Sequence, residues 1–379
     1  MLLALSSDQE LFRETTAKLL DELAPVGVLR ALRDDADGFD AGYWRRGADL
    51  GWTSLLVDEH HGGGSISGAG LVDLGLVAFE FGRHAAPGPL AVTNVVAATL
   101  AEAGGDGFDD VIKELLSGGA VATWCLAEPA PNDGLDSVSL DIRPDGAELV
   151  LNGVKRPVES AARAGYLLVT GRTGSGLTQV LVPAGTAGVA VSPMHSVDVT
   201  RRFSVVTFED VRVPRDRLVG AAGEAGDQVE FQLGRAVAIG CAESVGAMQT
   251  AFDMTVEWAF DRYSFGRPLA SYQELKHRFA DMLSWLEASH AVSDAATAAL
   301  SAGSPDAAEL LSVAKAFIGD YGGELMQGCV QMHGGIGVTF EHDLHLYLRR
   351  HTVNRALYGT PIEHRARLAD IVGQQEGLA

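Results

Sequence analysis

The hydrophobic pattern of this sequence changes near residue 119 and changes back near residue 220. Between these points lie short runs rich in β-branched residues and separated by turn residues, such as 166–173 (YLLVTGRT) and 203–214 (FSVVTFEDVRVP). On either side, apolar residues recur at the spacing of an α-helix instead. The pattern predicts an α+β, mainly α fold: an N-terminal helical domain over 1–118, a middle antiparallel β-domain over 119–220 and a C-terminal four-helix bundle over 221–379.

Three segments are long enough to form the main helices of that bundle: 231–266, 272–303 and 306–335. Each carries Gly and Ala at helical spacing. Small residues allow helix axes to approach closely, as in bundles that also form oligomers. We therefore expect these faces to take part in subunit packing.

Local signals mark several boundaries. Residues 7–10 (SDQE) are typical of a capping box that starts the first helix, with Ser7 as the N-cap. Residues 360–363 (TPIE) predict a second capping box, with proline at the first helical position. The dipeptide Asn152-Gly153 lies between two apolar runs and predicts a tight hairpin turn.

Composition excludes several classes of protein. The chain is 47% hydrophobic and 21% charged, which is enough for a sizeable core. Its formal net charge of −21 disfavours binding to nucleic acid or to an anionic membrane. No apolar run approaches the ~20 residues of a membrane span, and the N-terminal segment lacks the basic region of a signal peptide. We expect a cytoplasmic protein.

No metal site is predicted. The three cysteines lie far apart and form no CxxC pair, so neither a disulfide framework nor a zinc site is indicated. His342, His345 and His351 alternate with leucines in a helical stretch without a nearby cysteine or a further carboxylate ligand. We interpret them as solvated helix histidines.

Two stretches carry a strong resemblance to known proteins: 261–282 (DRYSFGRPLASYQELKHRFADM) and 331–350 (QMHGGIGVTFEHDLHLYLRR). Segments 50–64 (LGWTSLLVDEHHGGG) and 208–220 (FEDVRVPRDRLVG) add to it. In this order, across essentially the whole chain, the sequence resembles the acyl-CoA dehydrogenase family. The resemblance implies FAD-dependent α,β-dehydrogenation of an acyl-CoA thioester, in lipid or steroid side-chain catabolism, with an electron-acceptor flavoprotein.

The first stretch supplies residue types that suit a dinucleotide. Arg262 offers a bidentate fork for a diphosphate, Phe265 a flat apolar face, and Gln273 both a donor and an acceptor for a heterocycle. By resemblance, these three reach the ADP half of FAD held by a neighbouring subunit. The resemblance also assigns FAD contacts to Gln331 and to the pair Gly334-Gly335, where backbone N–H groups can approach a ligand closely.

The chain departs from the family on the side expected to hold its own flavin. The resemblance places Leu126, Ala127, Val158 and Thr360 against the flavin. Ala127 replaces a threonine whose hydroxyl can bond the isoalloxazine, and 157–159 (PVE) replaces Trp-Ile-Thr. Two side-chain contacts are therefore lost, and we expect weaker flavin binding by this half-site.

The family also needs a base near the substrate α-carbon, usually a glutamate just before a glycine. Here Tyr358 precedes Gly359, and Tyr263 occupies an alternative position for the base. Ionising a tyrosine of ordinary pKa at pH 7 costs about 4 kcal/mol, and burial adds to that cost. Glu363, the nearest carboxylate, is part of the predicted capping box. We therefore predict that the chain contributes no catalytic residue of its own.

A dehydrogenase-like chain without a base resembles one subunit of heterotetrameric actinobacterial acyl-CoA dehydrogenases, in which a homologous Glu-bearing partner supplies the base. Two alternatives remain open. In the first, the chain is a self-sufficient homo-oligomeric flavoenzyme with a relocated base. In the second, it is a catalytically inactive protein that binds acyl-CoA or serves as a scaffold. The acyl group, and its presentation by CoA or by a carrier protein, are also left open.

Overall fold

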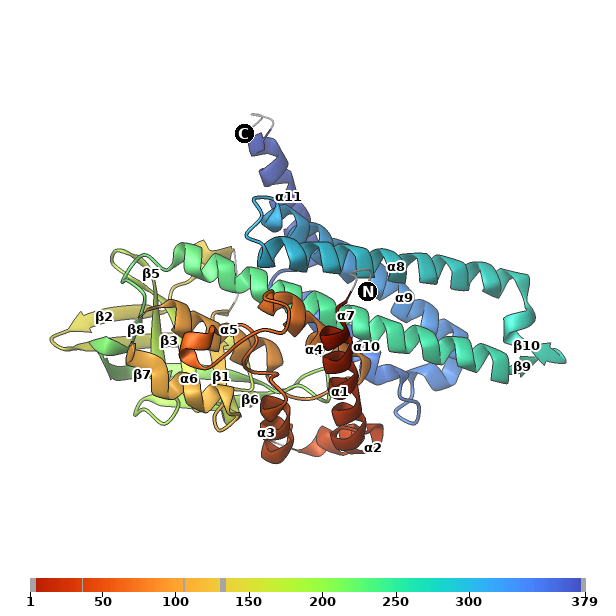
Figure 1. The fold of residues 1–379 in the computed structure, drawn as a ribbon, viewed down its shortest axis with the longest axis horizontal. Helices are drawn as coiled ribbons and strands as arrows, with labels where there is room; N and C mark the ends of the chain where they lie inside the picture. The colour runs from red at the N-terminus through yellow and green to blue at the C-terminus, as the bar shows by residue number, and fades with distance from the viewer. Residues whose placement is uncertain (1–4, 36, 105, 130–133, 376–379) are drawn as a thin grey trace.

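The computed structural model describes residues 5–35, 37–104, 106–129 and 134–375. Figure 1 shows an elongated molecule with a β-sheet at one end of its long axis and a small hairpin at the other, joined by long helices. The order of elements is helices, sheet, helices, as the hydrophobic pattern predicts. None of the described helices is long and apolar enough to cross a membrane.

The N-terminal part is helical. Its helices are α1 (Ser7–Leu23), α2 (Val26–Ala31), α3 (Ala41–Asp49), α4 (Gly70–Arg83), α5 (Leu90–Glu102) and α6 (Asp109–Leu116).

The capping box of α1 lies one residue earlier than 7–10. The hydroxyl of Ser6 accepts a hydrogen bond from the backbone N–H of Gln9 at 3.3 Å, and the Gln9 side chain accepts one from the N–H of Ser6 at 3.1 Å. The prediction of Ser7 as the N-cap is therefore wrong by one residue. Glutamine serves as well as glutamate at the third helical position, so the sequence allowed both registers.

The middle part is an eight-stranded sheet. Its strands are β1 (Ala122–Cys125), β2 (Asp141–Asp145), β3 (Glu148–Glu159), β4 (Tyr166–Thr173), β5 (Gly176–Pro183), β6 (Val189–Met194), β7 (Phe203–Pro214) and β8 (Leu218–Val219). Their order is β6-β7-β3-β2-β4-β5-β8, with β1 beside β4. Most neighbours are antiparallel, as predicted, but β1 and β2 run parallel to β4. The sequence pattern did not reveal this mixed pairing, nor the half-exposed strand β6.

The hairpin predicted at Asn152-Gly153 does not form there. The tight turn between β2 and β3 lies at Gly146-Ala147, and Asn152 is inside β3. At Gly153 the pairing of β3 with β7 shifts register in a bulge, where φ is 150°. The Asn152 side chain bonds the side chain and backbone of Asp210 on β7 at 3.0 and 2.8 Å. The Asn-Gly signal therefore marks a bulge rather than a turn.

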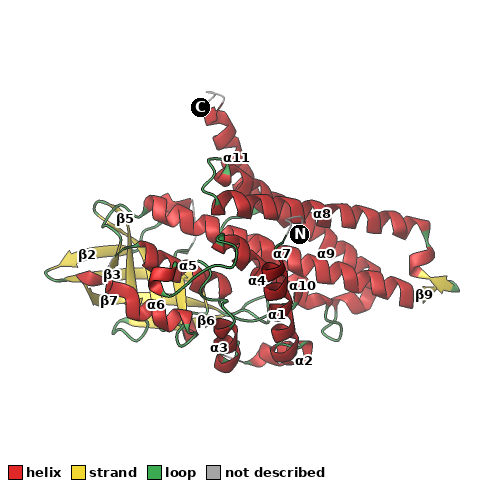
Figure 2. Ribbon diagram, in the orientation of Figure 1, coloured by secondary structure: helices red, strands yellow, loops and turns green. Residues whose placement is uncertain are grey.

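The C-terminal part contains the long helices. They are α7 (Gly226–Asp261), α8 (Gln273–Ser301), α9 (Ala307–His333), α10 (Leu344–Ala356) and α11 (Pro361–Gln375). Between α7 and α8 lies the hairpin of β9 (Tyr263–Ser264) and β10 (Arg267–Pro268), so the helix predicted over 231–266 ends earlier, at Asp261. Figure 2 shows the sheet and this hairpin at opposite ends of the bundle.

One hydrophobic core joins helices from both ends of the sequence. Leu74 and Val77 of α4 belong to the same buried cluster as Val245 and Met248 of α7. A second cluster fills the interior of the β-domain. The N-terminal and C-terminal helical regions therefore share one core, which also includes Trp124 and Leu168 of the sheet, and the β-domain has a second core.

The contact between α4 and α7 is very close because glycines face the opposite backbone. A Cβ added to Gly82 would lie 1.9 Å from the carbonyl oxygen of Glu243, and one added to Gly246 would lie 2.0 Å from that of Phe79. This part of the small-residue face of α7 is covered within the chain. The expectation that it serves subunit packing is wrong for this stretch of the helix.

Candidate functional site

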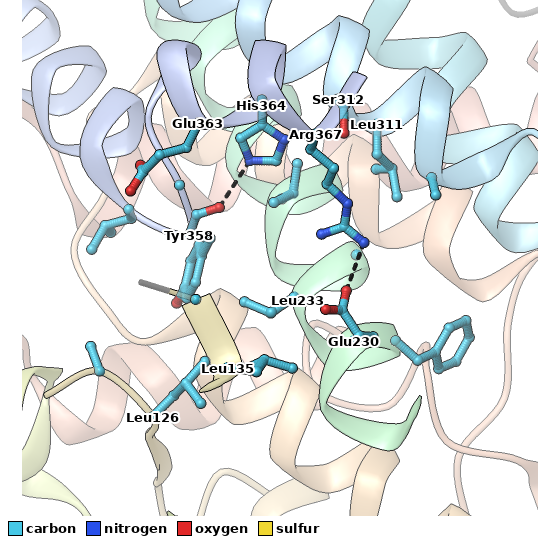
Figure 3. Close-up of a pocket in the computed structure, with 18 of the residues that line it drawn as sticks. Leu126, Leu135, Glu230, Leu233, Leu311, Ser312, Tyr358, Glu363, His364 and Arg367 are labelled. Carbon is cyan, nitrogen blue, oxygen red and sulfur yellow. Dashed lines mark hydrogen bonds and ion pairs between the residues drawn. The ribbon is translucent and has the colours of Figure 1, made fainter. Parts of the chain in front are cut away.

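A cavity of about 770 Å³ lies between the sheet, the N-terminal part of α7, the start of α9, and α11. This volume is typical of sites for small organic ligands. Figure 3 shows side chains from α7, α9, α11 and the corner before α11 converging on it. The inner end is apolar. Its lining residues include Val92, Trp124, Phe203, Val237, Leu311 and Tyr358.

The rings of Trp124 and Tyr358 stack on one another in the inner wall. Their planes are 19° apart and their centroids 6.3 Å apart. Nε1 of Trp124 donates a hydrogen bond to the Thr170 hydroxyl at 3.0 Å, which fixes the indole. The wall therefore suits an apolar chain or a planar ring.

Tyr358 lies at the corner between α10 and α11 in a left-handed backbone conformation, with φ of 58°. This region is costly for a residue other than glycine unless surrounding contacts fix it. Nζ of Lys315 on α9 donates a hydrogen bond to the carbonyl of Leu357 at 2.7 Å. Nε2 of His364 on α11 contacts the Tyr358 carbonyl at 3.0 Å. These buried groups hold the corner in place.

The contacts of His364 define its protonation. Because a carbonyl oxygen only accepts, Nε2 carries the hydrogen bonded to Tyr358, and Nδ1 accepts from the Ser312 hydroxyl at 3.3 Å. Burial also lowers the pKa of His364. Both ring nitrogens are therefore engaged, and the imidazole positions the corner rather than acting as a base.

Tyr358 itself is a poor base. Burial raises its pKa well above the ordinary value, and the charge of Glu159 raises it further. At neutral pH the side chain is an uncharged phenol that can donate a proton but has no tendency to take one.

Glu363 is engaged in the capping box predicted from TPIE. Its carboxylate accepts the backbone N–H of Thr360 at 2.6 Å, and the Thr360 hydroxyl accepts the N–H of Glu363 at 3.4 Å. These hydrogen bonds lower the pKa of Glu363. The structural interpretation of Glu363 is confirmed, and a carboxylate made more acidic is a weaker base.

Glu128, at the sheet side of the cavity, is bonded to the fully buried Lys155 at 2.7 Å and to Ser139 at 2.6 and 2.9 Å. Burial opposes its ionisation, but the Lys155 charge and these hydrogen bonds outweigh it and lower the pKa of Glu128. Nζ of Lys155 also bonds the carbonyl of Leu126 at 2.8 Å. The pair thus fixes the cavity wall formed by the segment after β1.

Glu159, also in the cavity wall, forms a bidentate ion pair with Arg201 at 2.7 and 2.5 Å. Arg201 also contacts Glu243 of α7, whose carboxylate pairs with Arg350 of α10 at 2.6 Å. Arg350 in turn bonds Asp198 at 2.6 Å. This buried network ties the sheet to α7 and α10 and leaves Glu159 committed to a guanidinium.

The outer end of the cavity is exposed and charged. Asp227 and Glu230 of α7 and Glu363 and Arg367 of α11 line it. Arg367 bonds Glu230 at 2.7 Å. Among the described lining residues, Arg367 is the only lysine or arginine, so this end is net acidic.

The residues predicted for the chain's own half-site are mostly at the cavity. Leu126, Ala127 and Thr360 line it. Val158 does not: its side chain is buried in the β-domain core, whereas its neighbours Pro157 and Glu159 line the cavity. Successive side chains of a strand point to opposite faces, so a flavin contact of Val158 would involve its backbone, and this contact stays a prediction.

The remaining predicted residues gather at the other end of the bundle, where α7 ends, α8 begins and α9 ends (Figure 1). They are all exposed, Phe265 to 98%. They are Arg262, Phe265, Gln273, Gln331, Gly334 and Gly335. About 37 Å of helix separates Val237 in the cavity from Arg262. One chain therefore cannot bring the two groups to the same ligand.

Tyr263, the alternative position for a base, belongs to this distant group. It lies in β9, is 63% exposed and is not among the residues that line the cavity. Within one chain it cannot share a site with Tyr358.

Two of the three histidines near the C-terminus are not solvated, contrary to our interpretation, whereas His342 is partly exposed. His345 and His351 are buried, and burial lowers the pKa of His351 to about 4, so it is neutral at pH 7. The inner face of α10 carries them. No group of His, Cys, Asp and Glu suited to a metal ion occurs among the residues that the structure describes.

Comparison with known proteins identifies the family. The family models of the acyl-CoA dehydrogenase N-terminal and C-terminal domains match residues 6–110 and 227–372. Acyl-CoA dehydrogenase IpdE2 of Mycobacterium tuberculosis is 31% identical over 372 residues, covering 95% of this chain and 96% of the relative. This chain belongs to the acyl-CoA dehydrogenase family.

Other relatives agree. IpdE2 of Mycolicibacterium smegmatis is 28% identical and covers 96% of this chain and 98% of the relative. A variant of the Tcur3481-Tcur3483 steroid ACAD superposes with a TM-score of 0.88 at 26% identity, covering 97% and 98% of the two chains. A glutaryl-coenzyme A dehydrogenase complex has a TM-score of 0.90 at 19% identity, with 100% and 98% covered, and supports the fold alone. As a family member the chain is an acyl-CoA dehydrogenase-like oxidoreductase with FAD as its cofactor.

The cavity fits one half of FAD better than the other. Its inner wall of Trp124, Leu126 and Tyr358 suits a flat, largely apolar ring. The carbonyls of Leu126 and Ala127 accept hydrogen bonds from Nζ of Lys155 and from the backbone N–H of Arg156, which fixes this segment of the wall. A diphosphate, in contrast, finds a single lysine or arginine among the described lining residues, Arg367, at an end of the cavity where carboxylates outnumber it. Arg262, which suits a diphosphate, lies at the distant end of the bundle.

Sequence reasoning missed the groups that shape the site: Lys315, His364, and the pair of Glu159 with Arg201. A lysine among the apolar residues of a helix and an arginine pair before a strand are weak signals of buried charge. Their role is visible only in the folded structure, where partners that are far apart in sequence lie within hydrogen-bond distance.

Proposed function

We propose that this chain is one subunit of an FAD-dependent acyl-CoA dehydrogenase and that a homologous partner supplies the catalytic glutamate. The observation that carries the proposal is the state of the cavity around Tyr358. Five carboxylates line the described part of the cavity. Four of them are engaged: Glu363 in a helix cap, Glu128 with Lys155, Glu159 with Arg201 and Glu230 with Arg367. The fifth, Asp227, lies at the exposed outer end.

In the reaction of the family, the α-proton of the thioester goes to a base while bound FAD accepts the β-hydride. The chain's own residues can bind the acyl group and exclude water. The apolar wall of Trp124, Val237 and Leu311 offers the acyl surface, and the corner held by Lys315 sets the position of Tyr358. None of these groups takes a proton at neutral pH.

The division of the predicted FAD residues into two distant groups supports an assembly. Arg262, Phe265 and Gln273 are exposed at the far end of the bundle, where they can reach a flavin held by another subunit. We propose that they complete the partner's site. This chain's own cavity, without the threonine replaced by Ala127, binds FAD weakly or only with help from the partner.

The acyl group is proposed to come from lipid or steroid side-chain catabolism, because one relative at 26% identity is described as a steroid ACAD. Electrons would then pass to an electron-acceptor flavoprotein.

Expression of the chain alone and together with a Glu-bearing homologue tests the proposal. Alone, we expect FAD below one per chain and negligible dehydrogenation of CoA thioesters. Together, we expect a four-chain assembly that holds fewer flavins than chains and is active. A homotetramer with one FAD per subunit and robust turnover would contradict the proposal and favour a self-sufficient enzyme with another base. A chain that binds CoA thioesters but never FAD, in either preparation, would indicate an inactive binding protein.

A further inference from the structure

The outer end of the cavity is spanned by a single ion pair between two helices. Arg367 of α11 reaches toward Glu230 of α7, with 2.7 Å between Nη2 and Oε2 (Figure 3). Both side chains are 43% exposed, whereas the inner wall behind them is buried. The pair therefore lies at the solvent-exposed end of the cavity, and Tyr358 lines its inner end.

The charges around the pair are unfavourable for an anionic ligand. Asp227 and Glu363 lie at the same end of the cavity, so its carboxylates outweigh the guanidinium of Arg367. The whole chain carries a formal charge of −21, which also repels anions. Binding of a phosphorylated thioester therefore requires a local cation, and Arg367 is the lysine or arginine that the described cavity wall provides.

We propose that Arg367 binds a phosphate of the substrate headgroup, which displaces Glu230 from its ion pair with Arg367. The inference rests on the proposed function, since it assumes an acyl thioester in this cavity. It adds a specificity residue that selects phosphorylated thioesters over uncharged ones.

The exchange is physically easy. An exposed ion pair is screened by solvent and contributes little to stability. A phosphate offers two oxygens to the planar guanidinium fork, which makes a stronger charge-assisted contact. After the exchange Glu230 faces water, so no unpaired charge is buried. The helix α11 stays in place because it packs against α9.

The chain provides a matched control on the same helix. Arg365 is also exposed and pairs with Asp320 of α9, but it does not line the cavity. Arg365→Gln and Arg367→Gln each remove one exposed ion pair from α11, and only the second alters the cavity.

Binding is measured by calorimetry on the purified full-length chain, with octanoyl-CoA and with octanoyl-pantetheine, which lacks phosphate. We expect Arg367→Gln to weaken binding of octanoyl-CoA by about tenfold or more and to leave octanoyl-pantetheine unaffected. Arg365→Gln should bind both as wild type does. Glu230→Gln, which frees the guanidinium, should bind octanoyl-CoA at least as tightly as wild type.

A third ligand, octanoyl-4′-phosphopantetheine, separates the two sources of the phosphate. A loss in Arg367→Gln for this ligand places the contact at the phosphate that CoA shares with carrier proteins. A loss for octanoyl-CoA alone places it at the other phosphates of CoA.

The inference is overturned if Arg367→Gln keeps wild-type affinity for octanoyl-CoA, or if Glu230→Gln loses as much affinity as Arg367→Gln, since the pair is then purely structural. Thermal unfolding of each variant shows that the fold is retained. Failure of the wild-type chain to bind octanoyl-CoA would count against the proposed function itself, and this inference would fall with it.

Discussion

Nζ of Lys315 lies 2.7 Å from the carbonyl oxygen of Leu357, the residue directly before Tyr358. The same ammonium bonds the carbonyl of Asn354, so it contacts the last turn of α10. Unpaired carbonyls at a helix C-terminus attract a cation. The position of Tyr358 in the cavity is therefore set by a buried residue on α9.

This lysine predicts a specific dependence of stability on pH. Burial lowers the pKa of Lys315 from 10.5 to about 8. Between these values the unfolded chain holds a proton that the folded chain lacks, so the free energy of unfolding rises with pH, by at most about 1.4 kcal/mol per pH unit. Below pH 8 both states are protonated and the contribution is constant. In urea titrations between pH 7 and 10, we expect wild type to gain stability relative to Lys315→Met above pH 8. A constant difference over this range would contradict the shift.

The capping box at the start of α11 is expected to be structural. Thr360→Ala should lower the free energy of unfolding by about 1 kcal/mol, because the first turn loses its cap. Glu363→Gln keeps an acceptor for the N–H of Thr360, so the turnover of the co-expressed assembly should be nearly unchanged. A hundredfold loss of rate in Glu363→Gln with unaltered stability would instead identify Glu363 as the base.

The crossing of α4 and α7 should not tolerate a methyl group. In Gly246→Ala the new Cβ would lie 2.0 Å from the carbonyl oxygen of Phe79, so the helices must separate. We expect a loss of about 3 kcal/mol. Gly240→Ala on the same helix is the matched control, because nothing lies within 4 Å of its Cβ. It should stabilise the chain by about 0.5–1 kcal/mol. Equal changes in the free energy of unfolding in the two variants would show that helix propensity, rather than the close contact, determines stability at these positions.

Arg262 is expected to contribute to flavin binding across the subunit interface. Arg262→Ala should lower the flavin content of the assembly, because a charge-assisted contact to the diphosphate, worth roughly 1.5–3 kcal/mol, is lost. The fold should be unaffected, since the side chain is exposed. Arg267→Ala in the same hairpin removes an equal charge that lies over the ring of Tyr272 and serves as the control. An unchanged FAD affinity in Arg262→Ala would show that Arg262 does not contribute to flavin binding.

Tyr358→Glu tests whether the cavity places a thioester near this position. In deuterated water the wild-type chain should not exchange the α-protons of a CoA thioester, because its phenol is neutral. Tyr358→Glu should exchange them, and a general base contributes about 10²–10⁴-fold in rate. Mass spectrometry of the recovered thioester gives the rate. Exchange by the wild-type chain at the same rate would show that another base exists.

Much of the architecture follows from local sequence. The period of the apolar residues predicted the order of helices and strands, because both periodicities are set by neighbours along the chain. The cap over TPIE was predicted for the same reason, since Thr360 and Glu363 bond within one turn. The resemblance of the two motif stretches added the family.

Other features were decided only by tertiary structure. Asn152-Gly153 carries a turn signal, yet pairing with β7 makes it a bulge. Whether the Val158 side chain points into the cavity or into the β-domain core depended on which face of β3 packs into that core.

The sequence by itself determined that Tyr358 stands where a carboxylate is expected, because this requires only the identity of one residue beside a glycine. It could not determine that the neighbouring carboxylates are engaged. Glu159 pairs with Arg201 because β3 lies beside β7. Lys155 pairs with Glu128 because β3 also contacts β1, and Lys315 bonds Leu357 because α9 packs against α10. Buried charges are tolerated only when a partner lies within hydrogen-bond reach, and which partner that is depends on the packing of distant segments.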